Sequence, residues 1–253
     1  MSNTIAIAHK ELRSYFASPI GLVMVGLFVL IYGFFYAVMF LNFEQQAMGQ
    51  FGGQSPMNLN EQLIGPLFGD VRVVLLFTLP LITMRTYAEE KRSGTMELLL
   101  TSPITDMQIV FGKFLGAMGL IAVMLAATLP HIGMLFYYAN PEWKPIVTNY
   151  LGFFLMAASF VAVGLFISSI TRNQIVAAMA TFAVFLLLWI VDWIGSFMGP
   201  TGQAIFEYLS ITRHFEDFAR GVIDTKHLVY YASVIIFGLV LTMRSVETER
   251  WRG

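Results

Sequence analysis

Long uncharged hydrophobic runs recur along this chain, and polar segments separate them. A helix needs about 20 consecutive apolar residues to cross the hydrocarbon core of a membrane. Five runs approach or exceed this length, at residues 20–41, 114–138, 145–171, 173–191 and 228–243. A sixth and shorter run, 73–84, follows Asp70 and Arg72 closely. The pattern therefore predicts five or six membrane-spanning helices.

The distribution of basic residues decides between five and six. With six spans and both chain ends in the cytoplasm, ten of the 15 Lys and Arg residues lie in inside segments: Lys10, Arg13, Arg85, Lys91, Arg92, Lys113, Arg172, Arg244, Arg250 and Arg252. This bias satisfies the positive-inside rule, whereas five spans would split the basic segments between the two faces. We therefore expect spans at about residues 19–41, 64–85, 107–138, 146–170, 174–195 and 227–244.

Composition agrees with a membrane protein. Hydrophobic residues make up 57% of the 253-residue chain and charged residues 12%, with a mean hydropathy of +0.70. So little charge could not cover the apolar surface of a water-soluble fold, and disorder requires the opposite composition. The net charge of −1 gives no basic surface for nucleic acid. We predict an all-α polytopic membrane protein, with residues 1–253 forming a single transmembrane domain in contact with lipid.

Two polar segments have amphipathic helical spacing. In residues 4–17, the side chains of Ile5, Ala8, Leu12 and Phe16 fall on one helical face. This suits a helix that lies in the cytoplasmic interface, and the alternative is a solubilised leader. The segment at about 203–222 is expected to be helical on the outer face, with Gly221 as its stop.

The segment 85–113 is the longest one on the predicted cytoplasmic side. Gly94 breaks it, a short helix is expected at about 93–102, and Pro103 ends that helix. The sequence from Thr105 to Gln108 fits a capping box at the start of the next span. The short helix carries three consecutive leucines, which need either the membrane interface or a docking partner to cover them.

Sequence motifs for chemistry are missing. There is no GxxxxGK[ST] phosphate loop, no HExxH and no GxSxG, so no catalytic residue is predicted. The four histidines, His9, His131, His214 and His227, have no spacing for a metal, and no metal site is expected. The candidate intramembrane polar sites are Asp70, Arg72 and Asp192, which could instead be residues at the water boundary. At i and i+2, Asp70 and Arg72 cannot face each other on a helix.

Residues 89–103, EEKRSGTMELLLTSP, followed by Gly112-Lys113, resemble the cytoplasmic hallmark of ABC-2 type permeases. These are membrane subunits of one class of ATP-binding-cassette (ABC) transporter. The opening AHKEL at 8–12 and the segment 215–224 are similar to the same family, closest to the permease subgroup associated with bacterial gliding motility.

The resemblance implies a set of partners and roles. Two permease subunits pair as a homodimer or a heterodimer in the bacterial inner membrane. A separate cytoplasmic ATPase binds ATP and Mg, while this chain holds no cofactor and is not itself an enzyme. Residues 4–17 would be the elbow helix and 93–102 the coupling helix. The ATPase-contacting residues would be Glu89, Glu90, Lys91, Arg92, Gly94, Thr95, Glu97, Leu98 and Leu99.

Three functions remain open at this point. The first is a permease that exports an unidentified substrate, with lipid-like or amphiphilic compounds as candidates. The second is an energy-transmitting subunit that drives an outer-face partner through residues 195–227 without moving a substrate. The third is an ATP-independent carrier that uses Asp70, Arg72 and Asp192.

Overall fold

The computed structural model describes residues 3–49, 59–139 and 141–251, and within them it shows helices and no β-strand. The elements in chain order are α1 (Asn3–Ala17), α2 (Pro19–Gly49), the π-helical turn η1 (Asn60–Ile64), α3 (Gly65–Ser93), α4 (Thr95–Thr101), α5 (Asp106–Ala126), α6 (Leu129–Tyr138), α7 (Trp143–Ile170), α8 (Gln174–Ser196), α9 (Pro200–Leu209), α10 (Arg213–Ala219) and α11 (Thr225–Arg250).

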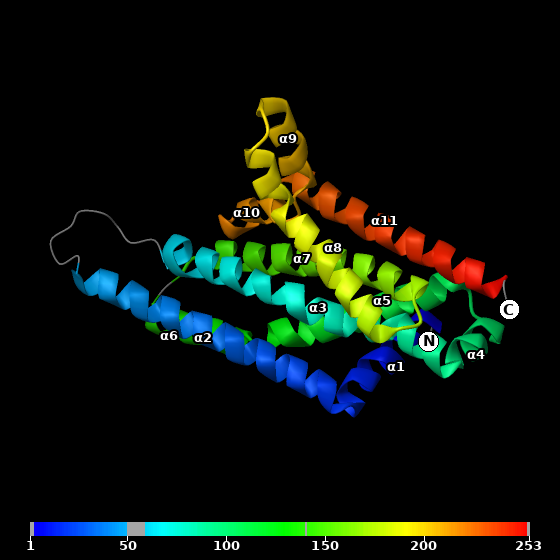
Figure 1. The fold of residues 1–253 in the computed structure, drawn as a ribbon. Helices are drawn as coiled ribbons and strands as arrows, with labels where there is room; N and C mark the ends of the chain where they lie inside the picture. The colour runs from blue at the N-terminus through cyan, green and yellow to red at the C-terminus, as the bar shows by residue number, and fades with distance from the viewer. Residues whose placement is uncertain (1–2, 50–58, 140, 252–253) are drawn as a thin grey trace.

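Six stretches of the described chain are helical, long and apolar enough to cross a membrane, which confirms the predicted number of spans. They are α2, η1 with α3, α5 with α6, α7, α8 and α11. The two ends of the chain lie at one end of this bundle, next to α4 (Figure 1). We call this the α4 end and the opposite one the far end. The molecule is thus an all-α, multi-pass membrane protein.

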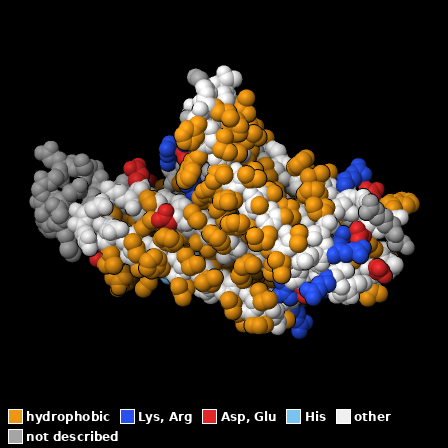
Figure 2. Space-filling model, viewed as in Figure 1, with side chains coloured by type: hydrophobic (Ala, Val, Ile, Leu, Met, Phe, Trp, Pro, Cys, Tyr) orange, Lys and Arg blue, Asp and Glu red, His pale blue; other side chains and the backbone are white. Residues whose placement is uncertain are grey.

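The surface of the bundle has the polarity that a bilayer demands. Hydrophobic side chains cover the middle of the visible face, and charged side chains gather toward its ends (Figure 2). α7 lies at the centre and packs against α3 and α11. In contrast, only 17% of the apolar stretches of α2 and α8 is buried. These two helices therefore leave apolar faces open to lipid or to another protein.

Close approach of α1 to α5 depends on two glycines. A Cβ atom added at Gly112 would lie 2.6 Å from Ile7 Cβ, and one added at Gly116 would lie 2.5 Å from Glu11 Cβ. The Gly-xxx-Gly spacing thus accommodates α1 rather than another span. On α1, Ile7 is buried against the bundle, whereas Ile5, on the face predicted to lie in the membrane interface, is exposed.

Several predicted boundaries differ from the observed helices. α2 continues to Gly49 and α3 to Ser93, beyond the predicted ends at 41 and 85, because backbone hydrogen bonding continues into polar sequence. The third span is broken into α5 and α6, with Pro130 in the first turn of α6. Proline lacks an N–H donor and is well tolerated there. The predicted outer helix at 203–222 is likewise two helices, α9 and α10.

Candidate functional site

The short helix α4 is held between two spans by local backbone signals. α3 ends at Ser93, and Gly94 takes the left-handed conformation with φ 75°, a geometry that glycine adopts without steric cost. α4 ends before Ser102 and Pro103. The Thr105 hydroxyl then accepts a hydrogen bond from Gln108 N–H, while the Gln108 side chain accepts one from Thr105 N–H. The predicted glycine break and capping box are both confirmed.

α4 has one buried anchor and one exposed face. Met96 is 3% exposed and packs into the core, whereas Leu98 is 72% exposed and Glu97 also faces solvent. Leu99 and Leu100 are partly buried against the core. A cavity of about 450 Å³ lies next to α4 and is lined partly by Met96, Glu97 and Arg172. The helix is therefore fixed from beneath while its outward surface stays open to a partner.

A buried lysine joins three helices immediately behind α4. Lys113 on α5 is 1% exposed, and its Nζ lies 2.9 Å from Glu90 Oε1 on α3 and 3.0 Å from Glu11 Oε1 on α1. The ammonium also donates to the Thr86 carbonyl at 2.8 Å and lies 5.0 Å above the Tyr87 ring centre. We call these residues the Lys113 cluster (Glu11, Thr86, Tyr87, Glu90 and Lys113). The four partners compensate the positive charge of Lys113, which would otherwise be costly to bury.

Three of the predicted ATPase-contacting side chains make internal ion pairs. Glu90 bonds Lys113, and the Lys91 Nζ atom lies 2.9 Å from Glu249 Oε2 on α11. Glu89 is half-buried and pairs with Arg85 through two hydrogen bonds. The exposed members of the predicted set are Arg92, Gly94, Thr95, Glu97 and Leu98. The residues that hold α4 in place and those that it exposes are therefore distinct.

Two of the candidate intramembrane polar residues, Asp70 and Arg72, point in different directions. Asp70 is exposed and lines a cavity of about 450 Å³ against α2. The Arg72 guanidinium carbon lies 5.3 Å from the Trp189 ring centre on α8 and 5.8 Å from that of Phe215 on α10. Asp70 and Arg72 therefore do not meet, as their spacing predicts. Asp192 belongs to α8, and its side chain lies outside the described part of the structure.

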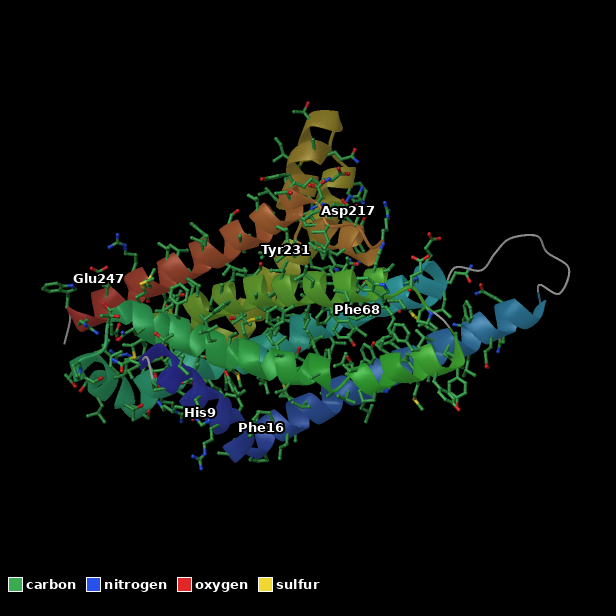
Figure 3. All side chains as sticks on the ribbon, turned by 180° about the vertical axis from the view of Figure 1, so that it is seen from behind. His9, Phe16, Phe68, Asp217, Tyr231 and Glu247 are labelled. Carbon is green, nitrogen blue, oxygen red and sulfur yellow. The ribbon has the colours of Figure 1, made fainter. Side chains whose placement is uncertain are left out.

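At the other end of the molecule, two histidines are in contact although their separation along the chain matches no known motif. His214 Nδ1 on α10 lies 2.6 Å from His227 Nδ1 on α11, and His227 Nε2 lies 2.6 Å from Asp217 Oδ2. Figure 3 shows Asp217 well removed along the bundle from His9 and Glu247. The sequence analysis found no metal-binding spacing among the four histidines, and the turn at Gly221 brings these two together in space.

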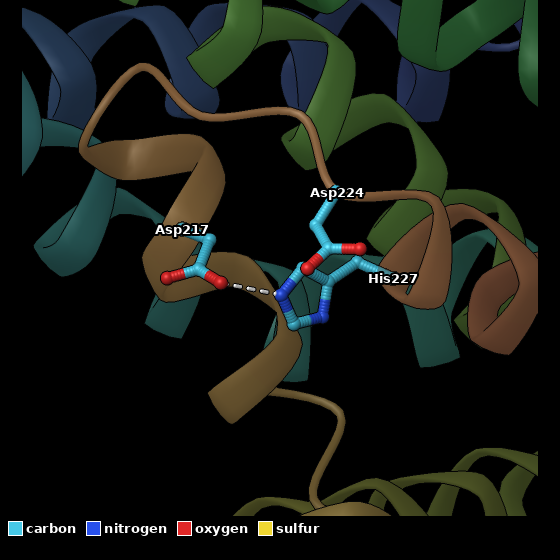
Figure 4. Close-up of side chains that lie close together, drawn as sticks. All are labelled: Asp217, Asp224 and His227. Carbon is cyan, nitrogen blue, oxygen red and sulfur yellow. Dashed lines mark hydrogen bonds and ion pairs between the residues drawn. The ribbon is translucent and has the colours of Figure 1, made fainter.

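Asp217, Asp224 and His227 offer atoms within 4.8 Å of one another, a separation that a metal ion could bridge (Figure 4). The contacts indicate hydrogen bonding instead. Two ligands of a tetrahedral zinc ion lie about 3.3 Å apart, given bonds of about 2.0 Å, which exceeds the 2.6 Å from Asp217 to His227. The Lys226 Nζ atom also lies 3.1 Å from Asp224 and 3.6 Å from Asp217. The ammonium thus supplies the positive charge between the two carboxylates.

Several residues of these sites had no signal in the sequence. Met96 looks like one more apolar residue beside three leucines, and Lys113 looks like an ordinary inside charge at the start of a span. The Lys113 and Glu11 side chains are 102 positions apart, so their contact follows only from the packing of α1 on α5. The Gly112 and Gly116 pair was the available clue that a helix approaches there.

The fold and the α4 site define a multi-pass membrane protein with a short helix exposed between two spans. Comparison with known families agrees: residues 5–244 match the family described as ABC-2 family transporter protein. The chain belongs to this family. A similar curated protein is the "Probable multidrug ABC transporter permease YbhR" of Escherichia coli K12, 26% identical over 147 residues, and the same protein of strain O157:H7 matches equally. The match covers 56% of this chain but only 39% of those relatives.

Proposed function

We propose that this chain is the permease subunit of an ABC transporter, and that a separate cytoplasmic ATPase docks on α4. The observation that carries the proposal is the division within α4 between buried Met96 and exposed Glu97 and Leu98. Leu98 is an apolar side chain exposed to solvent beside the charged Glu97, an arrangement typical of a surface that a partner protein covers. The ATPase would bind ATP and Mg, and both chain ends would be cytoplasmic.

The Lys113 cluster would carry motion away from the docking helix. It joins α1, α3 and α5 through charge-assisted contacts of 2.8–3.0 Å, and α3 leads directly into Gly94 and α4. A displacement of α4 would therefore move the elbow helix α1 and the third span together. In this account Glu90 and Lys91 position the docking helix, and Thr95, Glu97 and Leu98 touch the ATPase.

The transported substrate would be lipid-like or amphiphilic and would be exported across the bacterial inner membrane. The name of the relative YbhR, which describes a probable multidrug permease, supports the proposal that this chain transports chemically varied compounds. The open apolar faces of α2 and α8 support pairing with a second permease subunit, as a homodimer or a heterodimer. Lipid would cover the faces that remain.

A second candidate is transmission of energy to an outer partner without transport, as in a gliding-type machine. α9 supports it, because this helix projects from the side of the bundle and exposes Ile205, Tyr208 and Leu209 (Figure 1). The family match is to ABC-2 transporters generally and lends no support to a gliding subgroup. Deleting residues 200–209 distinguishes the two, because a transporter would keep some flux and an energy-transmitting subunit would lose its partner's motion.

Site-specific cross-linking tests the docking surface directly. The chain contains no cysteine, so Leu98→Cys creates a single attachment point. We expect a thiol cross-linker on Leu98→Cys to capture the co-expressed ATPase. Tyr138→Cys is the control: Tyr138 is also exposed, but it lies at the end of α6, away from α4, and should capture no ATPase. Equal capture by both variants, or none by Leu98→Cys in an intact complex, would contradict docking on α4.

Transport measurements test the consequence. In inverted membrane vesicles, Glu97→Arg should abolish ATP-dependent movement of a fluorescent amphiphile while membrane insertion stays normal. Glu247→Arg is the matched control, since Glu247 is also an acidic residue at the α4 end and pairs only locally with Arg244 at 2.9 Å. Normal transport by Glu97→Arg would refute the role given to α4.

A further inference from the structure

Three contacts in a row connect α9, α10 and α11 at the far side of the molecule from α4. His214 Nε2 lies 2.9 Å from the Tyr208 carbonyl at the end of α9. His214 Nδ1 meets His227 Nδ1 at 2.6 Å, and His227 Nε2 meets Asp217 Oδ2 at 2.6 Å. Both histidine residues are buried, each 5% exposed. Figure 4 shows the last of these contacts as a dashed line between Asp217 and His227.

The three contacts require three protons on two rings. A carbonyl and a carboxylate accept hydrogen bonds and donate none, so His214 Nε2 and His227 Nε2 must each carry a proton. The contact between the two Nδ1 atoms needs one more proton, because two lone pairs at 2.6 Å would repel. Two neutral imidazoles carry only two protons in total. The geometry therefore specifies one positive charge on the pair.

The 2.6 Å contact between His227 Nε2 and Asp217 Oδ2 places that charge on the His227 side of the pair. Burial lowers the pKa of His214, which favours its neutral form with Nε2–H donating to Tyr208 and Nδ1 accepting. The hydrogen bond from His227 lowers the pKa of Asp217, as expected for a carboxylate that faces an imidazolium. Asp224, in the α10–α11 loop, supports the positive charge, and the Lys226 ammonium at the start of α11 opposes it.

The other groups packed around the rings are mostly uncharged. The Tyr230 ring of α11 stacks on His214 at 3.8 Å, and the Tyr208 ring of α9 lies 5.7 Å away at its edge. Tyr231 of α11 and Phe218 of α10 complete the pocket, and both contact the histidines at 6.1–6.3 Å. Among the described residues, Asp217 is thus the carboxylate in direct contact with the two histidines.

We propose that His214, His227 and Asp217 form a proton-binding site that fastens α10 to the beginning of α11. With the proton bound, His227 donates to both His214 and Asp217, and α9, α10 and α11 are connected. When the proton leaves, one of the three contacts must break, because two neutral rings supply only two N–H donors. The ligand of the site is a proton from the side of the membrane on which α10 lies.

Loss of the proton would loosen the α9–α10 segment without unfolding it. Tyr230 donates to the Leu209 carbonyl at 2.8 Å and Tyr231 to the Ile211 carbonyl at 2.9 Å, and neither bond involves a histidine. Thr148 of α7 also donates to the Phe218 carbonyl at 2.9 Å. The segment therefore stays attached at its ends while α10 gains freedom. This inference concerns protonation alone and does not depend on ATPase docking.

Nitrogen NMR of the full chain in lipid nanodiscs tests the site. With ¹⁵N-labelled histidine, the two ring nitrogens of His227 should both be protonated at mildly acidic pH, and His214 should stay a neutral Nε2–H tautomer. His214→Asn and His227→Gln assign the resonances. Asp217→Asn removes the carboxylate that accepts from His227 Nε2–H, so the His214–His227 pair should bind its proton about tenfold more weakly. Glu216→Gln is the control on the same helix and should leave the midpoint unchanged.

Two results would overturn the proposal. One is a His227 ring that stays neutral from pH 5 to pH 8 in the wild type. The other is a midpoint that Asp217→Asn does not move, although the variant keeps its helical circular dichroism. Zinc is the remaining probe: a shift of the His227 Nε2 resonance at micromolar zinc would make the cluster a metal site and refute the proton assignment.

Discussion

Replacing Lys113 with methionine tests whether the buried charge cluster holds the α4 end together. Lys113→Met keeps the volume of the side chain but leaves Glu11 and Glu90 facing each other, and their side chains are only 13% and 16% exposed. It also leaves the Thr86 carbonyl without this donor. Removing one partner of a buried pair costs about 3–5 kcal/mol. Lys10, whose Nζ lies 3.6 Å from Glu90, offsets part of that cost, so we expect about 3 kcal/mol.

The assay is thermal unfolding of the purified full chain in mild detergent. For a chain of this size, about 3 kcal/mol corresponds to a fall in Tm of about 6–12 °C. Lys10→Met is the matched control, because Lys10 pairs with the same carboxylate but its side chain is 65% exposed. An exposed pair contributes about 1 kcal/mol or less, so this variant should lose about 4 °C at most.

A third variant separates lost charge compensation from a general packing defect. Adding Glu11→Gln and Glu90→Gln to Lys113→Met removes the uncompensated carboxylates, and most of the lost Tm should return. The reasoning is refuted if Lys113→Met unfolds at the same temperature as Lys10→Met. It is also refuted if the triple variant is no more stable than Lys113→Met alone.

The remaining predictions concern glycine positions and pH. Gly116→Ala should destabilise the chain by about 1–3 kcal/mol in the same unfolding assay, because the new Cβ would lie 2.5 Å from Glu11 Cβ. Gly26→Ala is the control and should be neutral or stabilising, since nothing lies within 4 Å of its added Cβ. An equal loss of stability in Gly116→Ala and Gly26→Ala would contradict the close packing of α1 on α5. Gly94→Ala should lower the free energy of unfolding by about 1–2 kcal/mol, because the φ of Gly94 is 75°. Backbone hydrogen exchange should rise first in α4, and unchanged exchange in α4 would contradict this prediction. The Asp217 carboxylate has a pKa below its ordinary 3.8, so its stabilisation is present above pH 3.8 and lost as the pH falls further. Exchange in α10 should therefore increase at such acidity in the wild type and respond less in Asp217→Asn.

The general fold could be predicted because its signals are local. Uncharged runs and the side on which Lys and Arg lie are enough to count six spans, and a glycine, a proline and a capping box delimit α4. Pro130 indicated a kink in the third span, and the chain divides there into α5 and α6. The break between α9 and α10 was not anticipated, because the amphipathic spacing of residues 203–222 continues across it.

The sites were predicted less well because they depend on contacts between distant segments. Residues 89–99 are recognisable as a group, yet nothing local indicates that Glu90 turns inward to Lys113 while Glu97 turns outward. His214 and His227 are 13 positions apart on different helices, a separation with no helical or metal-binding meaning. Their meeting follows from the left-handed Gly221 and from the way α10 packs on α7 and α11.

The unbroken length of α3 has a mechanical consequence. This helix runs for 29 residues, or about 44 Å at 1.5 Å per residue, from the π-helical turn to Gly94. A rigid rod of that length that tilts by about 5° displaces one end relative to the other by about 4 Å. Its far part contacts α10, so leverage alone would deliver a movement at α4 to the opposite side of the membrane. A bend at Pro80, inside the helix, would reduce the movement that reaches α10.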